Sequence, residues 1–152
     1  SFIGTAISQV FFKQATEEIN KTGNIINTFN STLKKLIILS VPIFGIIFLI
    51  IRPVFAIVFG INWEKSGLYA MIMTPLFAVN FIVRTFTLVP FVFNKNFIDF
   101  TFQIGILILS ILPFCFKIKN FNNLLLLYSF LLGFYYFIYL LYLSKFKVIK
   151  SQ

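Results

Sequence analysis

Four polar side chains in the apolar stretch 67–93 are the residues most able to do chemistry. Tyr69, Asn80, Arg84 and Thr87 fall within a narrow arc at 100° per residue, together with Met73. Because hydrocarbon penalises polar groups, we expect this arc to line a hydrated cavity. Arg84 would there offer its planar set of donors to a phosphate-bearing ligand. The alternative is that Arg84 extends toward the cytoplasmic lipid head groups.

Two other charged residues lie within or at the ends of apolar stretches. Arg52 comes directly before Pro53, which frees a carbonyl in the preceding turn. Local bonding or extension toward head groups therefore competes with ligand binding at Arg52. Asp99 is a candidate for holding a coupling cation, but it follows Asn96 by three residues. That place favours a carboxylate that caps the free amides of a helix start.

Acid–base catalysis is poorly provided for. The sequence has no histidine, and its only acids are Glu17, Glu18, Glu64 and Asp99. We find no acid–base pair, activated nucleophile or metal-ligand spacing, and the single Cys115 allows no intrachain disulfide. We therefore expect no enzyme activity, no cofactor and no metal site. A polymerase or ligase for surface sugars is disfavoured for the same reason.

The composition is that of a membrane protein. Of the 152 residues, 59% are hydrophobic and 11% are charged, and the mean hydropathy is +0.96. Soluble domains carry about 25% charged residues. The net charge of +9 comes from basic residues that mostly flank apolar stretches. This placement indicates contact with membrane lipids and argues against nucleic-acid binding.

We predict an all-α, polytopic membrane protein with about four complete transmembrane helices and the end of a fifth. Residues 1–35 would hold the end of a truncated spanning helix, a break near Thr22-Gly23 and an amphipathic helix along the cytoplasmic surface. The transmembrane region 36–143 would contain four spans, and residues 144–152 would form a cytoplasmic basic tail. The predicted spans are 36–59, 67–93, 97–116 and 124–143.

The connection between the first two spans reads as a helical hairpin at a bilayer surface. Gly60 would stop one helix in the left-handed conformation, and Asn62 would cap the next. Trp63 and Tyr69 are amphipathic rings typical of a membrane–water boundary. Pro53 and Pro75 should bend the helices on either side of this turn, as should Pro42.

Small and aromatic residues predict how the helices pack. Ser129 and Gly133 should form a contact point for another helix, and a second arc of the 67–93 helix has the small-residue spacing of a packing face. Tyrosines recur on one face of span 124–143, where they would pack and form an interfacial belt or, alternatively, a sugar-stacking surface. That second arc holds Ala70, Thr74, Ala78 and Thr85, and the tyrosines are Tyr128, Tyr135, Tyr139 and Tyr142.

Flanking charge predicts the orientation. The segment before the first span, the loop between the second and third, and the tail share one side and hold eight lysines, against three on the other side. By the positive-inside rule the eight-lysine side is cytoplasmic. The Trp63 turn would face outward, and the C-terminus would be cytoplasmic. The eight are Lys13, Lys21, Lys34, Lys35, Lys95, Lys145, Lys147 and Lys150.

The hairpin stretch resembles a known family. The string Pro53-x-Phe55-x-x-x-Phe59-Gly60-x-x-Trp63-x-x-Ser66-Gly67-x-Tyr69, followed by Pro75-Leu76-Phe77-Ala78, is similar to the C-terminal half of polysaccharide-biosynthesis or oligosaccharide flippases. Ile7-Ser8-Gln9-Val10-Phe11-Phe12 is similar to the helix end before that family's cytoplasmic segment. These flippases for O-antigen and capsule repeat units belong to the multidrug/oligosaccharidyl-lipid/polysaccharide exporter superfamily. Pro53, Phe59, Gly60, Trp63, Gly67 and Pro75 would shape the structure.

The resemblance implies a fold and a function. The chain would be part of the second lobe of a two-lobed flippase in the bacterial inner membrane. It would move undecaprenyl-pyrophosphate-linked oligosaccharide repeat units outward by alternating access. Lipid-linked oligosaccharide, membrane lipids and other surface-polysaccharide assembly proteins would be its partners. A drug or metabolite exporter of the same superfamily is the alternative. Relatives often carry a small residue and proline around Arg84, so a role for Arg84 would be particular to this branch.

Overall fold

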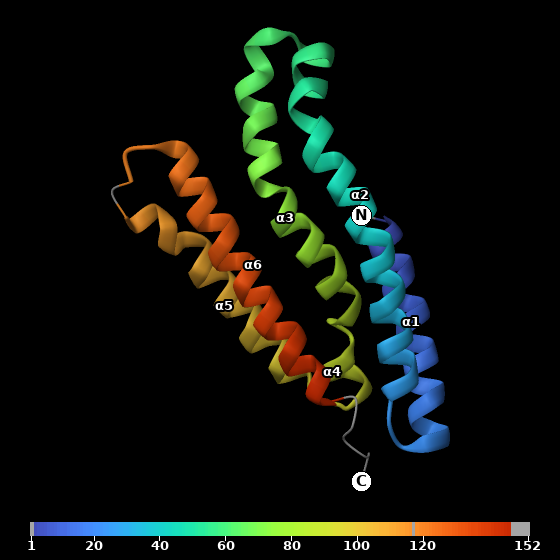
Figure 1. Ribbon diagram of the computed structural model, residues 1–152. Helices are drawn as coiled ribbons and strands as arrows, with labels where there is room; N and C mark the ends of the chain where they lie inside the picture. The colour runs from blue at the N-terminus through green and yellow to red at the C-terminus, as the bar shows by residue number, and fades with distance from the viewer. Residues whose placement is uncertain (1, 117, 147–152) are drawn as a thin grey trace.

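The computed structural model describes residues 2–116 and 118–146, with side chains from residue 6 onward. In this part of the chain the structure is all helical, and successive long helices run in opposite directions (Figure 1). Among the described residues, four helical segments are long and apolar enough to cross a membrane, which confirms the predicted class of all-α polytopic membrane protein. The elements are α1 (Phe2–Thr22), α2 (Ile26–Phe59), η1 (Ile61–Trp63), α3 (Glu64–Phe86), α4 (Val89–Val92), α5 (Asn96–Cys115) and α6 (Phe121–Phe146).

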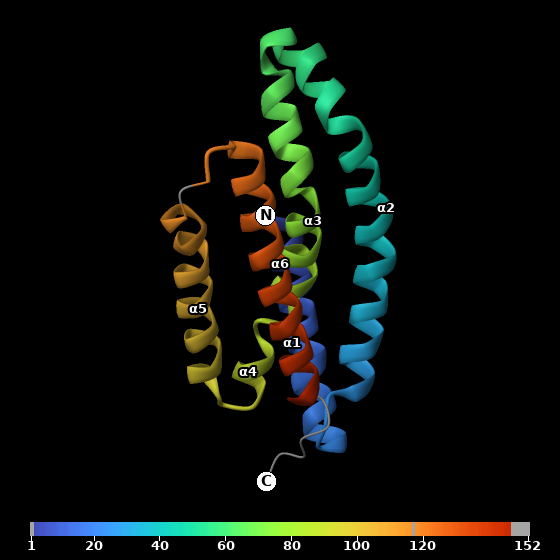
Figure 2. The ribbon, with the colours of Figure 1, turned by 60° about the vertical axis from the view of Figure 1, so that its left-hand side comes forward.

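The break between α1 and α2 falls where it was predicted, because Gly23 adopts a positive φ of 72° directly after Thr22. The prediction of a separate amphipathic helix along the membrane surface was wrong. Residues from Ile26 onward are continuous with the first span in one helix of 34 residues. No proline or glycine interrupts this stretch before Pro42, and its apolar side packs against α1 and α3. α2 continues through Pro42 and Pro53 and curves along its length (Figure 2).

A carboxylate from α1 caps the start of α2. Glu18 accepts the backbone N–H groups of Asn27 and Thr28 at 3.0 and 2.8 Å. These are two of the amides that have no partner inside a new helix. Burial by itself raises the pKa of Glu18, but the hydrogen bonds from Thr28 and Asn27 outweigh it, so the pKa lies below the ordinary value. The turn between the two helices is therefore fixed by charge as well as by Gly23.

The second predicted span is divided in the structure. α3 ends at Phe86, Thr87 and Leu88 form a turn, and the short α4 begins one residue before Pro90. Pro90 has no N–H to offer the carbonyl of Phe86, and its ring would clash with that carbonyl in a continuous helix. The predicted span 67–93 therefore contains a helix break, although the segment Ile61–Val92 as a whole is long and apolar enough to cross a membrane, as predicted. Pro75, by contrast, lies inside α3 as predicted.

The last two helices agree with the predicted spans to within three residues at each end. α5 runs from Asn96 to Cys115 and α6 from Phe121 to Phe146. The predicted basic tail begins as the last turn of α6, and its residues 147–152 lie outside the described part of the chain. The α1–α2 turn, the α4–α5 turn and the end of α6 all lie at one end of the molecule, which we call the lysine end (Figure 1).

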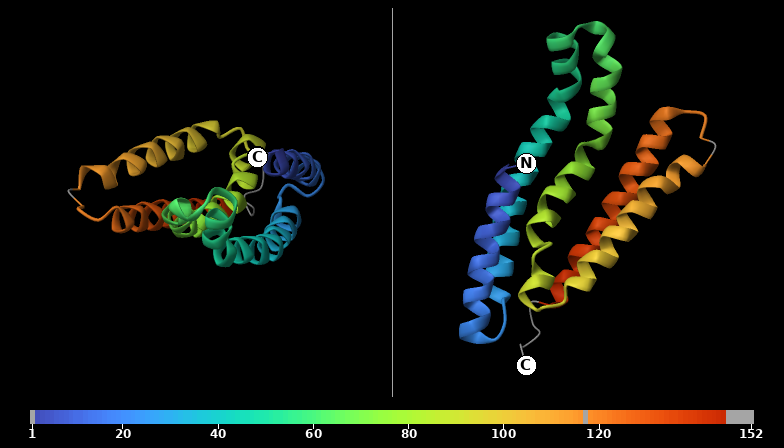
Figure 3. Two further views of the ribbon diagram at one scale, coloured as in Figure 1. Left: turned by 90° about the horizontal axis from the view of Figure 1, so that it is seen from above. Right: turned by 180° about the vertical axis from the view of Figure 1, so that it is seen from behind.

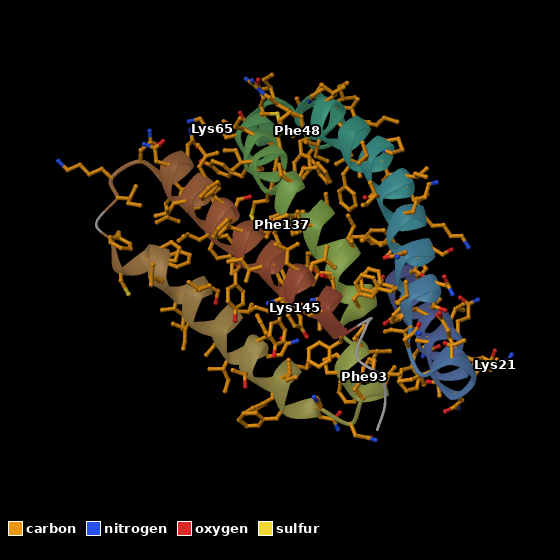
Figure 4. The ribbon with its side chains drawn as sticks, turned by 60° about the horizontal axis from the view of Figure 1, so that its bottom comes forward. Lys21, Phe48, Lys65, Phe93, Phe137 and Lys145 are labelled. Carbon is orange, nitrogen blue, oxygen red and sulfur yellow. The ribbon has the colours of Figure 1, made fainter. Side chains whose placement is uncertain are left out.

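The buried core is concentrated at the lysine end. The Phe86 ring of α3 packs edge-on against Phe11 of α1, with ring centroids 5.1 Å apart, and lies tilted against Phe29 of α2, with ring centroids 4.5 Å apart. Figure 4 labels Lys21, Phe93 and Lys145 near this end, and Lys65 at the opposite end of α3. Away from the core, the α2–α3 and α5–α6 hairpins diverge (Figure 3). The core residues are Phe11, Ala15, Ile19, Ile25, Phe29, Leu36, Val83, Phe86, Val89, Tyr139, Leu143 and Phe146.

The tip of the α2–α3 hairpin is built on two glycines. Gly60 ends α2 with φ 96° and ψ 163°, an extended positive-φ conformation open mainly to glycine, not the left-handed helical one that was predicted. Gly67 lies so close to α2 that a Cβ there would stand 2.8 Å from the Arg52 Cα. Asn62 does not cap α3. It belongs to the η1 turn, and Trp63 occupies the cap position without a side-chain hydrogen bond.

An ion pair, missed in the sequence, links the two helices of this tip. Arg52 of α2 donates from Nη2 to the Glu64 carboxylate at 2.6 Å and from Nε at 3.0 Å. Glu64 lies in the first turn of α3, where a carboxylate also suits the helix dipole. Arg52 therefore bonds locally, although its partner is a side chain and not the carbonyl freed by Pro53.

Candidate functional site

A cavity of about 760 Å³ lies among α1, α2, α3, α5 and α6. This volume is within the range of small-molecule sites. Its wall combines one cation, several uncharged polar groups and aromatic rings. The lining residues are Ser8, Gln9, Phe44, Phe77, Asn80, Phe81, Val83, Arg84, Thr87, Leu88, Gln103, Ile106, Tyr136 and Tyr139.

Three of the four predicted cavity residues lie together on this wall. Asn80, Arg84 and Thr87 are four and three residues apart in sequence, and the cavity borders all three. Asn80 and Arg84 stand one turn apart on α3. Thr87 follows the helix end, where its hydroxyl donates to the Arg84 carbonyl at 2.9 Å. Because of Pro90, α3 ends just beyond Arg84, and the turn residues Thr87 and Leu88 line the cavity next to this helix end. Their binding role stays a prediction.

The Arg84 guanidinium faces the cavity without an ion pair or hydrogen bond to any described residue. The side chain is exposed, and the Tyr136 hydroxyl of α6 is close enough to feel its charge. None of the lining residues is acidic. An uncompensated guanidinium in a cavity without carboxylates makes the wall electropositive.

The depth of the cavity follows from helix rise. Tyr139 stands six residues before Lys145 on α6, and Phe44 stands nine residues after Lys35 on α2. At 1.5 Å per residue these separations are about 9 and 14 Å. Half of a hydrocarbon core is about 15 Å. If the lysines mark the membrane surface, the cavity lies between that surface and the midplane.

The α5–α6 wall is held by a hydrogen bond that corrects the expectation for Asp99. Asp99 makes no cap. Its carboxylate accepts the Tyr139 hydroxyl at 2.7 Å, and Lys95 occupies the helix cap without a side-chain hydrogen bond. Phe102, on the next turn of α5, stacks on the Tyr139 ring at 4.1 Å. The Asp99 carboxylate bonds to the Tyr139 hydroxyl because the packing of α6 against α5 places that hydroxyl within hydrogen-bond distance. Tyr139 itself is 1% exposed.

Tyr69, the fourth predicted cavity residue, lies elsewhere. It stands in the first turns of α3, at the end away from the lysines, and packs edge-on against Phe121 at 4.9 Å. Tyr69 shares the helical face of Arg84, but it is 15 residues away along α3, or about 22 Å. The structure therefore does not bring Tyr69 to the cavity.

Sequence reasoning missed part of the wall. Ser8 and Gln9 of α1 border the cavity, and Ser8 donates to the Thr85 carbonyl of α3 at 3.3 Å. Tyr136 of α6 also lies on the wall, one residue outside the tyrosine stripe that drew attention. The available signal was polarity: Ser8-Gln9 interrupts an otherwise apolar face of α1, and such groups are expected to face protein or water.

The predicted packing contacts are partly confirmed. Ser129 of α6 donates to the Ile72 carbonyl of α3 at 3.2 Å, as expected of a helix contact point. Gly133 is not such a point, because a Cβ there would meet nothing within 4 Å. The motif residues Pro53, Phe59, Gly60, Trp63, Gly67 and Pro75 lie on α2, the η1 turn and α3, apart from the cavity, with Phe59 and Trp63 in ring contact at 5.9 Å.

Comparison of the chain with protein-family models, curated proteins and solved structures finds no match in any of the three. The flippase resemblance therefore rests on the quoted residues alone.

Proposed function

We propose that this chain is part of a flippase that moves lipid-linked oligosaccharides across the bacterial inner membrane for surface-polysaccharide synthesis. The cargo would be an undecaprenyl-pyrophosphate-linked repeat unit, moved by alternating access. The observation that carries the proposal is the cavity among apolar helices, where Arg84 is the only charged side chain among the described lining residues. Such a wall attracts an anionic head group, and its described residues include no carboxylate for a cation.

The charge of the wall argues against one form of the alternative, an exporter of cationic drugs. A carboxylate is the usual partner of a cationic drug, and the described residues that line the cavity include none. A pyrophosphate, in contrast, matches the donors of a guanidinium, and the side chain of the lining residue Arg84 makes no hydrogen bond or ion pair with a described residue. The surrounding helices expose apolar side chains, such as Leu49 at 74% and Leu107 at 61%, that suit acyl and isoprenyl chains.

The membrane placement belongs to the same proposal. The lysine end would face the cytoplasm, which puts the cavity in the cytoplasmic half of the bilayer. A lipid-linked sugar made on the cytoplasmic side would then meet Arg84 soon after entering the protein. The C-terminus would be cytoplasmic, and the Trp63 tip would face outward.

The test is surface-polysaccharide export in a strain whose only flippase gene encodes this chain. Arg84→Ala and Arg84→Lys should both lower export, Arg84→Ala more, because a lysine keeps the charge but not the bidentate geometry. Arg52→Ala is the matched control, since it removes the other arginine of the chain at a site far from the cavity. All variants are compared at equal protein levels in the membrane.

Two outcomes would count against the proposal. Normal export by both Arg84 variants would remove Arg84 from the mechanism. Intact surface polysaccharide after deletion of the gene would refute the flippase function and favour the drug or metabolite exporter.

A further inference from the structure

Three carboxamide side chains reach the same cavity from three different helices. Gln9 comes from α1, Asn80 from α3 and Gln103 from α5. The side chains of Gln9 and Gln103 make no hydrogen bond with any described residue, whereas Asn80 interacts with the Tyr136 hydroxyl. A carboxamide carries both donors and an acceptor and has no charge. Together they form a neutral hydrogen-bonding array around the space beside Arg84.

Carboxamides at this place in an apolar helix bundle are expected to have a polar ligand as their partner. Gln103 stands seven residues after Asn96, the first residue of α5, or about 10 Å along the helix. Exposing a free carboxamide to hydrocarbon at that depth is unfavourable, so the group is expected to meet a polar partner. Lipid tails offer no such partner, and a phosphate accepts hydrogen bonds but has none to give to the amide oxygens.

We infer that Gln9, Asn80 and Gln103 bind the first sugar of the cargo, next to a pyrophosphate at Arg84. This inference rests on the proposed function. Sugar hydroxyl and acetamido groups both donate and accept, and they point outward in several directions, which matches amides that converge from three helices. Aromatic rings complete the site, because the apolar face of a pyranose packs on such rings. The rings on this wall that are not buried are Phe44, Phe77, Phe81 and Tyr136.

The arrangement also orders the two parts of the ligand along α3. Asn80 stands one turn farther from the lysine end than Arg84, or about 6 Å. The pyrophosphate therefore binds nearer the lysine end, and the first sugar binds nearer the midplane. Because carboxamides are uncharged, the site distinguishes sugars by their hydroxyl and acetamido groups and not by their charge.

Binding of two matched ligands to the full-length protein in lipid nanodiscs tests the inference. The ligands are geranyl pyrophosphate and geranyl pyrophosphate that carries N-acetylglucosamine, and affinity is measured by calorimetry. The sugar-bearing ligand should bind more tightly. Gln9→Leu and Gln103→Leu should each weaken it by about three- to tenfold, the effect of losing one hydrogen bond. Affinity for the sugar-free ligand should stay unchanged, which also shows that the variant is folded.

Controls separate the sugar site from the pyrophosphate site. Gln14→Leu changes another exposed glutamine of α1 that does not border the cavity, and it should leave both affinities unchanged. Arg84→Ala should weaken both ligands alike. The inference is overturned if the sugar adds no affinity, or if the leucine variants weaken both ligands equally. If neither ligand binds the unmodified protein, the proposed function fails and the inference with it.

Discussion

Replacement of Gly67 by alanine should force the α2–α3 hairpin apart. The new Cβ would stand 2.8 Å from the Arg52 Cα, 3.0 Å from its carbonyl oxygen and 3.0 Å from the Phe55 Cβ. An ordinary contact begins at 3.4 Å, so the facing backbone must move by about 0.6 Å. Backbone atoms of a helix cannot turn aside as a flexible side chain can, so the whole hairpin must adjust.

The magnitude follows from two opposed effects. Overpacking of this kind costs about 1–3 kcal/mol, whereas alanine gains up to about 1 kcal/mol over glycine in helix propensity. Gly67→Ala should therefore lower the free energy of unfolding by up to about 2 kcal/mol. Gly133→Ala is the matched control, because its Cβ meets nothing within 4 Å, and it should raise that free energy by up to about 1 kcal/mol.

The assay is unfolding by sodium dodecyl sulfate in mixed micelles, followed by circular dichroism for both variants and the unmodified protein. Comparison of the two variants cancels helix propensity and leaves the overpacking cost of about 1–3 kcal/mol. A Gly67→Ala variant as stable as Gly133→Ala would refute the close approach of α2 and α3 at this point.

Three further perturbations test the contacts that fix the helices. Glu18→Ala should cost about 1 kcal/mol as a lost helix cap. Since the native pKa of Glu18 is lowered, its stabilisation is full above the ordinary value of 4.5 and is lost as the pH falls through the native pKa. Tyr139→Phe should cost about 0.6 kcal/mol, and no more than about 1.7, by removing the bond to Asp99. Glu64→Gln should cost less than about 1 kcal/mol at low salt, because both side chains of its pair with Arg52 are about half exposed.

Each of these perturbations has its own control, read out by the same unfolding assay. Glu17→Ala removes the neighbouring exposed carboxylate, and a loss equal to that of Glu18→Ala would exclude a specific cap. Tyr139→Phe combined with Asp99→Ala should cost less than the two single changes added together, and strict additivity would show that the bond contributes nothing. The cost of Glu64→Gln should vanish at high salt, and a cost that persists there would point to packing instead of charge.

The sequence was sufficient for the helices and for one wall of the cavity. Apolar length defined the four spans, and the 100° arc placed Asn80 and Arg84 side by side because both lie on one rigid helix. The same rule failed for Tyr69, because an arc describes direction around a helix and not position along it. Contacts between helices were the hardest to foresee, since Asp99 and Tyr139, or Arg52 and Glu64, become neighbours only when the helices pack.

Local signals also competed with one another. Asn62 and Asp99 both have the residue type and spacing of caps, yet neither caps a helix. Asn62 lies within the η1 turn, and Asp99 accepts a hydrogen bond from Tyr139 of α6. Pro90 determines where α3 ends, whereas hydropathy alone predicted a span that continues past Pro90. Ser8 and Gln9 joined the cavity only because the turn at Gly23 folds α1 back along α2 and α3.

Because the core is concentrated at the lysine end, a small rotation of the α2–α3 hairpin about the core moves its tip much farther than its base. Val83 is held in that core, and Glu64 at the tip lies 19 residues away along α3, or about 29 Å. A rotation of about 10° about the core would displace the tip by about 5 Å, while Arg84, next to the pivot, would hardly move. Such a rotation would have to break the contacts of α3 with α6 at Ile72 and Tyr69. Motion of the outer tip thus leaves the cavity wall of α3 nearly in place.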